Sequence, residues 1–411
     1  MTSVDETAAH QTPVLRTAVL VLSLSAFLSA ISLRITDALL PSFAQQFGIT
    51  LGHAASVITV FSVAYGLSQL LFGPLGDRFG KYLVVAYACV ACAVTATLCG
   101  LATDFPLLIA ARLFAGATAA AVIPLSMAFI GDVVPYDQRQ PVLARFLIGQ
   151  ILGLSTGVWL GGFAADHLSW RIPFLLIGGG FVLVSVALFA LNRRLPATAR
   201  VTRRAEGNAV ARMLQEFGQV LSRPWARVVL GTVFLEGAFL YGVFAFIATH
   251  LHAVFGLSLS TAGSMVMLYG FGGLLFAIFS ATLVRRLGEV GLTCIGGLLI
   301  AASLLAIGLA PVWWWAMPAC FVAGLGFYML HNTLQINATQ MAPERRGAAV
   351  SAFASCFFLG QAAGVGLAGL LVGYWGTGAV IGLGACGVLV VAINFSRLKA
   401  RSLGMAARAV S

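Results

Sequence analysis

Apolar runs of about 20 residues recur along almost the whole sequence, and this pattern restricts the chain to one architecture. Continuous runs of this length suit helices that cross the hydrocarbon core of a bilayer, whereas membrane-barrel strands alternate over about 10 residues. The chain is 60% hydrophobic and only 9% charged, although a soluble domain carries about 25% charged residues. We therefore predict an all-α polytopic membrane protein.

The apolar runs define twelve spans, which one long polar stretch divides into two sets of six. The predicted spans are approximately 17–41, 53–72, 82–102, 106–130, 142–163, 172–192, 228–250, 261–284, 290–310, 313–337, 347–373 and 378–396. We interpret 193–227 as a cytoplasmic linker between six-helix bundles at 1–192 and 228–411. Inside the linker, Ala209–Leu221 has the amphipathic spacing of a helix that lies along a membrane surface.

The positive charges lie almost entirely on one side of the predicted topology. Of 24 Lys and Arg residues, 21 fall in the even-numbered connections and the two tails, and Arg171 alone falls on the other side. Basic loops stay in the cytoplasm, so both termini are predicted to be cytoplasmic, in a bacterial inner membrane. The net charge of +11 thus reflects topology, and we expect no nucleic-acid partner.

The two halves resemble each other at a nearly constant offset. "FGITLGHAAS" from Phe47 matches "FGLSLSTAGS" from Phe255, 208 residues later, and the segment ending in Gly80 matches the one ending in Gly288 at the same offset. Tyr136 matches Pro343 at an offset of 207, and "LIGQILG" matches "FLGQAAG" at an offset of 211. Repeats packed about a central axis place a substrate site between them, near mid-membrane.

The segment "FGPLGDRFGK", from Phe72 to Lys81, lies between spans two and three. Its glycines permit a tight turn, its aspartate can accept hydrogen bonds from a helix N-terminus, and its cations can pair with acidic loops of the other half. The segment resembles the loop 2–3 signature of the major facilitator superfamily, on Gly73, Gly76, Asp77, Arg78, Gly80 and Lys81.

This resemblance implies two six-helix bundles that rock about a central cavity, with the loop latching the cytoplasmic side in the outward-facing state. The second copy carries Arg285 where the first carries Asp77. We therefore expect an asymmetric latch.

Spans four and five carry two further patterns of this superfamily. Arg112, with Gly116 one turn later, is similar to the buried arginine motif of proton-driven members, and structural pairing with helix ends is the alternative role. Span five contains Gly153, Gly157, Gly161 and Gly162, whose spacing lets another helix approach closely. The pattern resembles an antiporter signature, except that Val158 stands where proline is expected, and it favours export.

Charged residues inside spans are the candidates for proton coupling. Arg34 and Asp37 share one face of span one at i, i+3, and counting from Thr17 places Asp37 near the outer boundary. The partner of Asp37 is either Arg34 or Arg112, in a switching pair or a static one. Desolvation favours the protonated form of Glu236 in span seven, which suits a proton carrier, although a structural glutamate is the alternative.

Uncharged polar residues inside spans are the candidates for substrate binding. In span ten, His331 and Gln335 share a face at i, i+4, with Asn332 beside them. Gln150 and Gln361 occupy matching positions of the repeat and are expected to form a pseudo-symmetric pair that faces the cavity. Interhelical hydrogen bonding and a bound water are the alternatives for these side chains.

Together these features predict a secondary active transporter, a proton-driven antiporter that exports small molecules such as drugs, sugars or metabolites. Proton-coupled uptake of a sugar, amino acid or organic anion is the alternative. An intramembrane enzyme using Glu236 and His331 has little support, since the sequence offers no HExxH motif, and a receptor without flux would need a longer signalling domain than this linker. The lack of a GxxxxGK[ST] motif argues against an ATP-driven pump. We expect a monomer that needs no cofactor. All seven cysteines, including the Cys89–Cys92 pair, lie in apolar spans, so we expect no disulfide framework and no metal or redox site.

Overall fold

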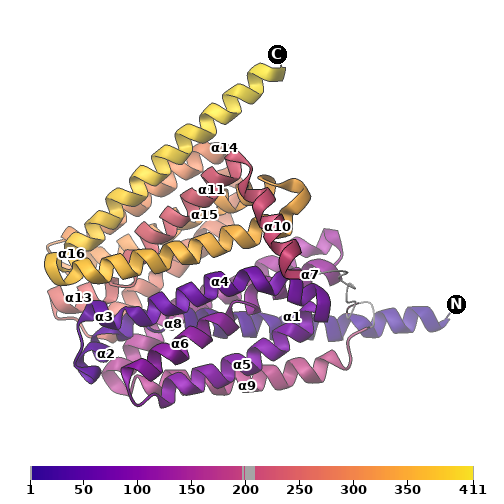
Figure 1. Cartoon of the computed structure of the whole chain (residues 1–411), viewed down its shortest axis with the longest axis horizontal. Helices are drawn as coiled ribbons and strands as arrows, with labels where there is room; N and C mark the ends of the chain where they lie inside the picture. Colours follow the sequence, from indigo (N-terminus) through magenta and orange to yellow (C-terminus); the bar gives the residue numbers. More distant parts are fainter. Residues whose placement is uncertain (1, 197–198, 200–208, 411) are drawn as a thin grey trace.

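The structure, a computed structural model, describes residues 2–196, 199 and 209–410. Within these ranges every regular element is a helix, and the helices lie roughly parallel in one elongated stack (Figure 1). Both termini and the linker helix lie towards one end, which we call the terminal side. The opposite end, which carries the connections at Gly48, Gly256 and Gly376, is the distal side.

The first half contains six helical spans, several of them interrupted. Their elements are α1 (Thr2–Arg34), η1 (Asp37–Leu39), α2 (Leu40–Phe47), α3 (Leu51–Ala54), α4 (Ser56–Phe79), α5 (Lys81–Leu101), α6 (Phe105–Ala119), α7 (Val122–Val133), α8 (Tyr136–His167) and α9 (Arg171–Asn192). The predicted linker forms the helix α10 (Ala209–Leu221), while its residues 197–198 and 200–208 lie outside the described residues.

The second half repeats this arrangement. Its elements are α11 (Pro224–Glu236), the π-helix η3 (Gly237–Tyr241), α12 (Gly242–Phe244), α13 (Ile247–Phe255), α14 (Leu259–Leu309), η4 (Trp313–Trp315), α15 (Ala316–Gln340), η5 (Pro343–Arg345) and α16 (Arg346–Val410). Ten helical stretches are long and apolar enough to cross a membrane, of which two, at 51 and 61 residues, far exceed the ~20 residues of one crossing. Each of these breaks at a single glycine with positive φ, Gly288 or Gly376, so the described chain has twelve crossings.

The repeat is visible in the backbone conformation. Gly48 and Gly256, 208 residues apart, both adopt left-handed conformations at helix ends, and Gly80 and Gly288 are again 208 apart with positive φ. L-residues with side chains rarely adopt these angles. The predicted duplication is therefore confirmed at the level of the turns between spans.

Small residues set the packing of helices within each half. Backbone carbonyls of the first span lie against Gly153, Gly157 and Gly161 of α8, and carbonyls of the seventh span lie in the same way against Gly360 and Gly364 of α16. Such contacts bring two helix backbones close together. Since Gly153 corresponds to Gly360 at an offset of 207, the predicted match of Gln150 with Gln361 is wrong by one helical turn.

The two halves meet along two seams in the distal part of the molecule. At one seam, α3 and α4 lie beside α16, and Gly52 approaches the backbone of Gly369 closely. At the other, α8 lies beside α14, and Gly162 approaches the backbone of Leu259. A side chain at Gly52 or Gly162 would overlap the facing carbonyl group, so glycine is required for this close contact.

Candidate functional site

The first span is broken where its charged residues lie. Helix α1 ends at Arg34, a short turn and η1 follow, and α2 continues to Phe47. Pro41 occupies the first turn of α2, a position that tolerates proline because it needs no backbone N–H. The predicted end of span one at residue 41 is therefore wrong. Asp37 lies ten residues before Phe47, roughly 15 Å along a helix, and so is well inside the span.

Arg34 and Asp37 form an ion pair in this break. Arg34 Nη1 lies 3.2 Å from Asp37 Oδ2, and both side chains are buried. The guanidinium also lies 3.8 Å from the centre of the Tyr241 ring, which belongs to the second half. Aromatic faces attract cations. Arg34 thus contacts both Asp37 in the first span and Tyr241 in the second half.

Arg112 is fully buried in α6 and bonds to backbone rather than to Asp37. Its Nε donates to the carbonyl of Val57 at 3.4 Å and its Nη1 donates to the carbonyl of Ser32 at 3.1 Å. Its guanidinium also lies 4.0 Å from the centre of the Phe61 ring. Of the two predicted partners, Arg34 is the one that pairs with Asp37 in this structure.

Two polar atoms beside this pair are left over. Among the described residues, Asp37 Oδ1 and Arg112 Nη2 are both buried without a hydrogen-bond partner. A buried polar group without a partner is unfavourable by about 1–3 kcal/mol. The two atoms carry opposite charge, and Arg112 already contacts the first span through the Ser32 carbonyl, so a movement that joined them would remove both penalties.

A second buried carboxylate lies in the second half. Glu236 is fully buried at the last turn of α11, directly before the π-helix η3, and its Oε2 lies 2.9 Å from Nδ1 of His331 in α15. Its Oε1 is buried without a partner among the described residues. Single π-turns inside α-helices occur frequently at functional sites. Glu236 and His331, predicted for different roles, are thus brought together.

Aromatic rings surround this pair and connect it to Arg34. The His331 ring stacks on Phe327 with ring centres 4.8 Å apart, and Phe357 lies at the same distance. Phe357 contacts Tyr241, the ring that receives Arg34, and the Tyr241 hydroxyl lies 3.0 Å from that of Tyr269. Tyr241 is not among the residues predicted from the sequence, although it lies only five residues after Glu236 in the same span.

The remaining predicted binding residues are not gathered at one place. Gln361 is fully buried and donates to Ser62 Oγ at 3.1 Å, so it joins α16 to α4. Gln150 and Asn332 are half-buried, and Gln335 is exposed. The expected pair of Gln150 and Gln361 does not form, because the two residues lie one turn out of register.

The loop motif at the terminal side is bound within its own half. Lys81 Nζ lies 2.5 Å from Asp132 and 3.7 Å from Asp77, while Arg78 is exposed and lies over Phe79. Gly80 supplies the positive φ of the turn. Both carboxylates belong to the first half, so these ion pairs of Lys81 do not reach the other half in this structure, and the latch expected for the outward-facing state stays a prediction.

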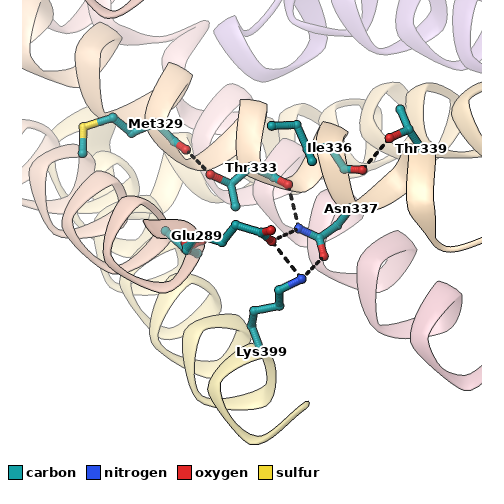
Figure 2. A network of polar contacts seen from close by, with 8 residues as sticks. Glu289, Met329, Thr333, Ile336, Asn337, Thr339 and Lys399 are labelled. Carbon is teal, nitrogen blue, oxygen red and sulfur yellow. Dashed lines mark hydrogen bonds and ion pairs between the residues drawn. The ribbon is translucent and has the colours of Figure 1, made fainter. Parts of the chain in front are cut away.

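At the equivalent place in the second half, a different network forms (Figure 2). Glu289, 208 residues after Lys81, lies 2.8 Å from Lys399 Nζ, and its Oε2 accepts a hydrogen bond from Asn337 Nδ2. Lys399 also donates to Asn337 Oδ1 at 2.7 Å and faces the Trp225 ring. This network joins the ninth, tenth and twelfth spans to one another, and none of its residues was predicted from the sequence.

On the distal side a carboxylate of the first half caps a helix of the second. Asp166, near the end of α8, accepts hydrogen bonds from the backbone N–H of Leu259 at 3.2 Å and of Ser260 at 2.6 Å. The Ser260 hydroxyl donates to the same carboxylate at 2.5 Å. Because free N–H groups at a helix start attract negative charge, this contact holds the two halves together.

No described group of His, Cys, Asp or Glu side chains is arranged to hold a metal ion. The groups that the structure does bring together are buried acids, arginines and aromatic rings. Such groups can exchange protons and bind small molecules.

Known proteins resemble this chain in both sequence and structure. A family model described as Major Facilitator Superfamily matches residues 22–365. An uncharacterized MFS-type transporter, YceJ of Bacillus subtilis (strain 168), is 26% identical over 337 residues, which are 81% of this chain and 83% of that protein. A probable sugar efflux transporter of Helicobacter acinonychis (strain Sheeba) is 22% identical over 93% of this chain and 95% of its own length.

A third relative matches over a shorter region. The multidrug export protein EmrB of Escherichia coli (strain K12) is 30% identical over 180 residues, which are 44% of this chain and 35% of that protein. Two crystal structures share the fold. A bacterial homolog of the human lysosomal transporter Spinster has a TM-score of 0.74 at 18% identity, covering 95% of this chain and 97% of its own. The nucleoside transporter NupG (D323A mutant) has a TM-score of 0.77 at 14% identity, covering 92% and 98%.

Proposed function

Since the chain belongs to the major facilitator superfamily and is therefore a membrane transporter, we propose that it is a proton-driven antiporter that exports small molecules. The observation that carries this proposal is the buried Asp37, which lies between two arginines at the break of the first span. A buried ionisable residue in a span marks a transport pathway more often than a structural role. Relatives named for multidrug export and sugar efflux support the direction.

We propose that both termini face the cytoplasm and that the distal side faces outwards. The segregation of 21 of the 24 Lys and Arg residues supports this orientation. Asp166 and the close glycine contacts join the halves on the distal side, which in this orientation supports a state closed to the outside. The bundles at 1–192 and 228–411 would then move against each other, with the membrane of a bacterial cell as the site of action.

Proton coupling follows from the competing partners of Asp37. When it is ionised, Asp37 holds Arg34 beside the break and against Tyr241 of the facing half. When it takes up a proton from outside, the ion pair is lost and Arg34 is free to leave Tyr241. The proton-dependent step is therefore a weakening of the contact between the first and the seventh span. Alternating access requires such a change, because the two halves must move against each other.

The second carboxylate is proposed to act on the substrate side of the cycle. Glu236 has one oxygen on His331 and one without a partner, so it can bind a proton or a polar group of the substrate. His331 contacts it from α15, and the rings of Phe327 and Phe357 provide an apolar surface for the rest of a small molecule. We assign binding to this group and coupling to Asp37.

The test is proton flux in proteoliposomes of known orientation, screened with chemically diverse substrates. Export predicts that an inward proton gradient drives substrate in the opposite direction. Asp37→Asn should abolish the dependence on the gradient and leave substrate exchange measurable. Glu236→Gln should reduce substrate binding itself. Gradient-driven transport that survives fully in both variants would overturn the mechanism, and co-movement of proton and substrate would show uptake instead.

A further inference from the structure

A groove of about 1370 Å³ runs along one seam between the two halves, in the distal part of the molecule. One wall belongs to α3 and α4 and includes Gly52, Thr59 and Val63, and the other belongs to α16 and includes Ala363 and Gly366. These helices lie side by side in Figure 1. The proposed proton and substrate residues do not line this groove.

The groove is open because glycines of α16 that line it have no side chains. A methyl group on Gly366 would have Thr59 Cγ2, at 4.0 Å, as its neighbour across the seam, and one on Gly373 would meet nothing within 4 Å. Both glycines have ordinary helical conformations, since neither is among those with positive φ. Their lack of a side chain therefore serves space rather than backbone geometry.

The rim of the groove shows which medium fills it. Leu367, Leu370, Tyr374 and Trp375 are between 58% and 87% exposed. Large apolar side chains on a membrane-crossing helix face hydrocarbon, and exposed aromatic residues near a helix end are typical of the headgroup level. The groove is continuous with this lipid-facing surface, so its occupant comes from the bilayer.

The length of the groove matches one leaflet. On α16 it extends from Leu359 to Gly373, which corresponds to about 21 Å of helix. One leaflet contributes about 15 Å of hydrocarbon, or about 20–22 Å together with its headgroup region. Polar side chains gather at the distal end, where Thr50, His53 and Thr377 line the groove, and this is the level at which a headgroup would lie.

We propose that the groove binds an acyl chain of a phospholipid from the distal leaflet, with its headgroup near His53. Because the walls belong to different halves, the bound chain bridges them only while Gly52 and Gly369 are in contact. A ligand that binds one state stabilises that state. The lipid therefore favours the state in which the distal side is closed, independently of which substrate the protein carries.

The test uses the whole protein in phosphatidylethanolamine and phosphatidylglycerol vesicles that contain a phosphatidylethanolamine with a diazirine midway along one acyl chain. After illumination, labelled peptides are mapped by mass spectrometry. We expect residues 50–63 and 359–373 both to be labelled several-fold more than the lipid-facing helix α9. Labelling spread evenly over all exposed helices would overturn the proposal.

Variants that fill the groove test whether the groove itself is the labelled site. Gly366→Phe and Gly373→Phe each place a ring into the groove and should reduce labelling of 50–63 to the level of α9. The matched control is Gly179→Phe, since Gly179 is another helical glycine with nothing within 4 Å of an added methyl group. Labelling unchanged in both groove variants refutes the site. A diazirine fatty acid that competes as well as the phospholipid would refute the headgroup's part in it.

Discussion

The cap that Asp166 places on α14 offers the sharpest test of how the distal side is held closed. Asp166→Ala removes a carboxylate that accepts two backbone N–H groups and one hydroxyl, all from Leu259 and Ser260 in the other half. The change leaves the packing of Gly162 untouched. We expect the distal side to open more often, with little loss of folded protein.

The size of the effect follows from known capping energies. Replacing an N-cap residue by alanine costs about 0.5–2 kcal/mol, and a charge at a helix N-terminus contributes about 0.3–1 kcal/mol. Asp166 is exposed, so solvent weakens its charge and we take about 1–2 kcal/mol for the whole contact. The ratio of distal-open to distal-closed molecules should therefore rise roughly 5- to 30-fold.

Distances between spin labels at Gln46 and Val254 would report this ratio, because both residues are exposed near the distal end of their respective halves. The seven cysteines are first replaced. Asp104→Ala is the matched control: Asp104 caps α6 through the Leu107 N–H at 2.9 Å, but within its own half. If both variants gave the same distance distribution, the cap across the seam would have no role in closure.

Three further variants test other contacts. Gly52→Ala puts a methyl group into the Gly369 carbonyl, which should disfavour distal closure by about 1–3 kcal/mol and lengthen the same label distance, whereas an unchanged distance would contradict the glycine seam. Lys399→Met leaves the Glu289 carboxylate without its cation and should lower the free energy of unfolding by about 1–3 kcal/mol. Thermal unfolding measures this loss, and the double variant Glu289→Gln/Lys399→Met should recover part of it. Tyr241→Leu removes the ring under Arg34 and should lower the free energy of unfolding by about 0.5–2 kcal/mol, more than Tyr241→Phe does. Equal unfolding midpoints for the two variants would argue against the cation–π contact.

The fold could be predicted from the sequence because the bilayer imposes so few choices. Run length and the duplication predict twelve helices in two related sets, and the turn glycines near residues 80 and 288 follow from the same offset. Span ends are less predictable, since Pro41 can begin a helix as well as end one. That single position decides whether Asp37 lies at the membrane boundary or inside it.

The partners of buried polar residues could be predicted only as alternatives. Arg34 and Arg112 lie at depths from which either could pair with Asp37. In the structure the break after Arg34 brings Arg34 to Asp37, whereas Arg112 donates to backbone carbonyls instead. Glu236 and His331 lie 95 residues apart, and no periodicity relates them. The predicted pair of Gln150 and Gln361 is wrong for a related reason. The glycine contacts between helices, rather than the best match of residue identities, set the register between the two halves.

The positions of these partners also bear on how the protein is made. Arg34 and Asp37 belong to one span, so their charges can neutralise each other as soon as that span enters the membrane. The carbonyls that receive Arg112 come from spans one and two, which are synthesised before it. Glu236 has the opposite situation, since His331 emerges three spans later. The seventh span must therefore enter the bilayer carrying an unpaired acid, and its partner arrives only when the tenth has been inserted.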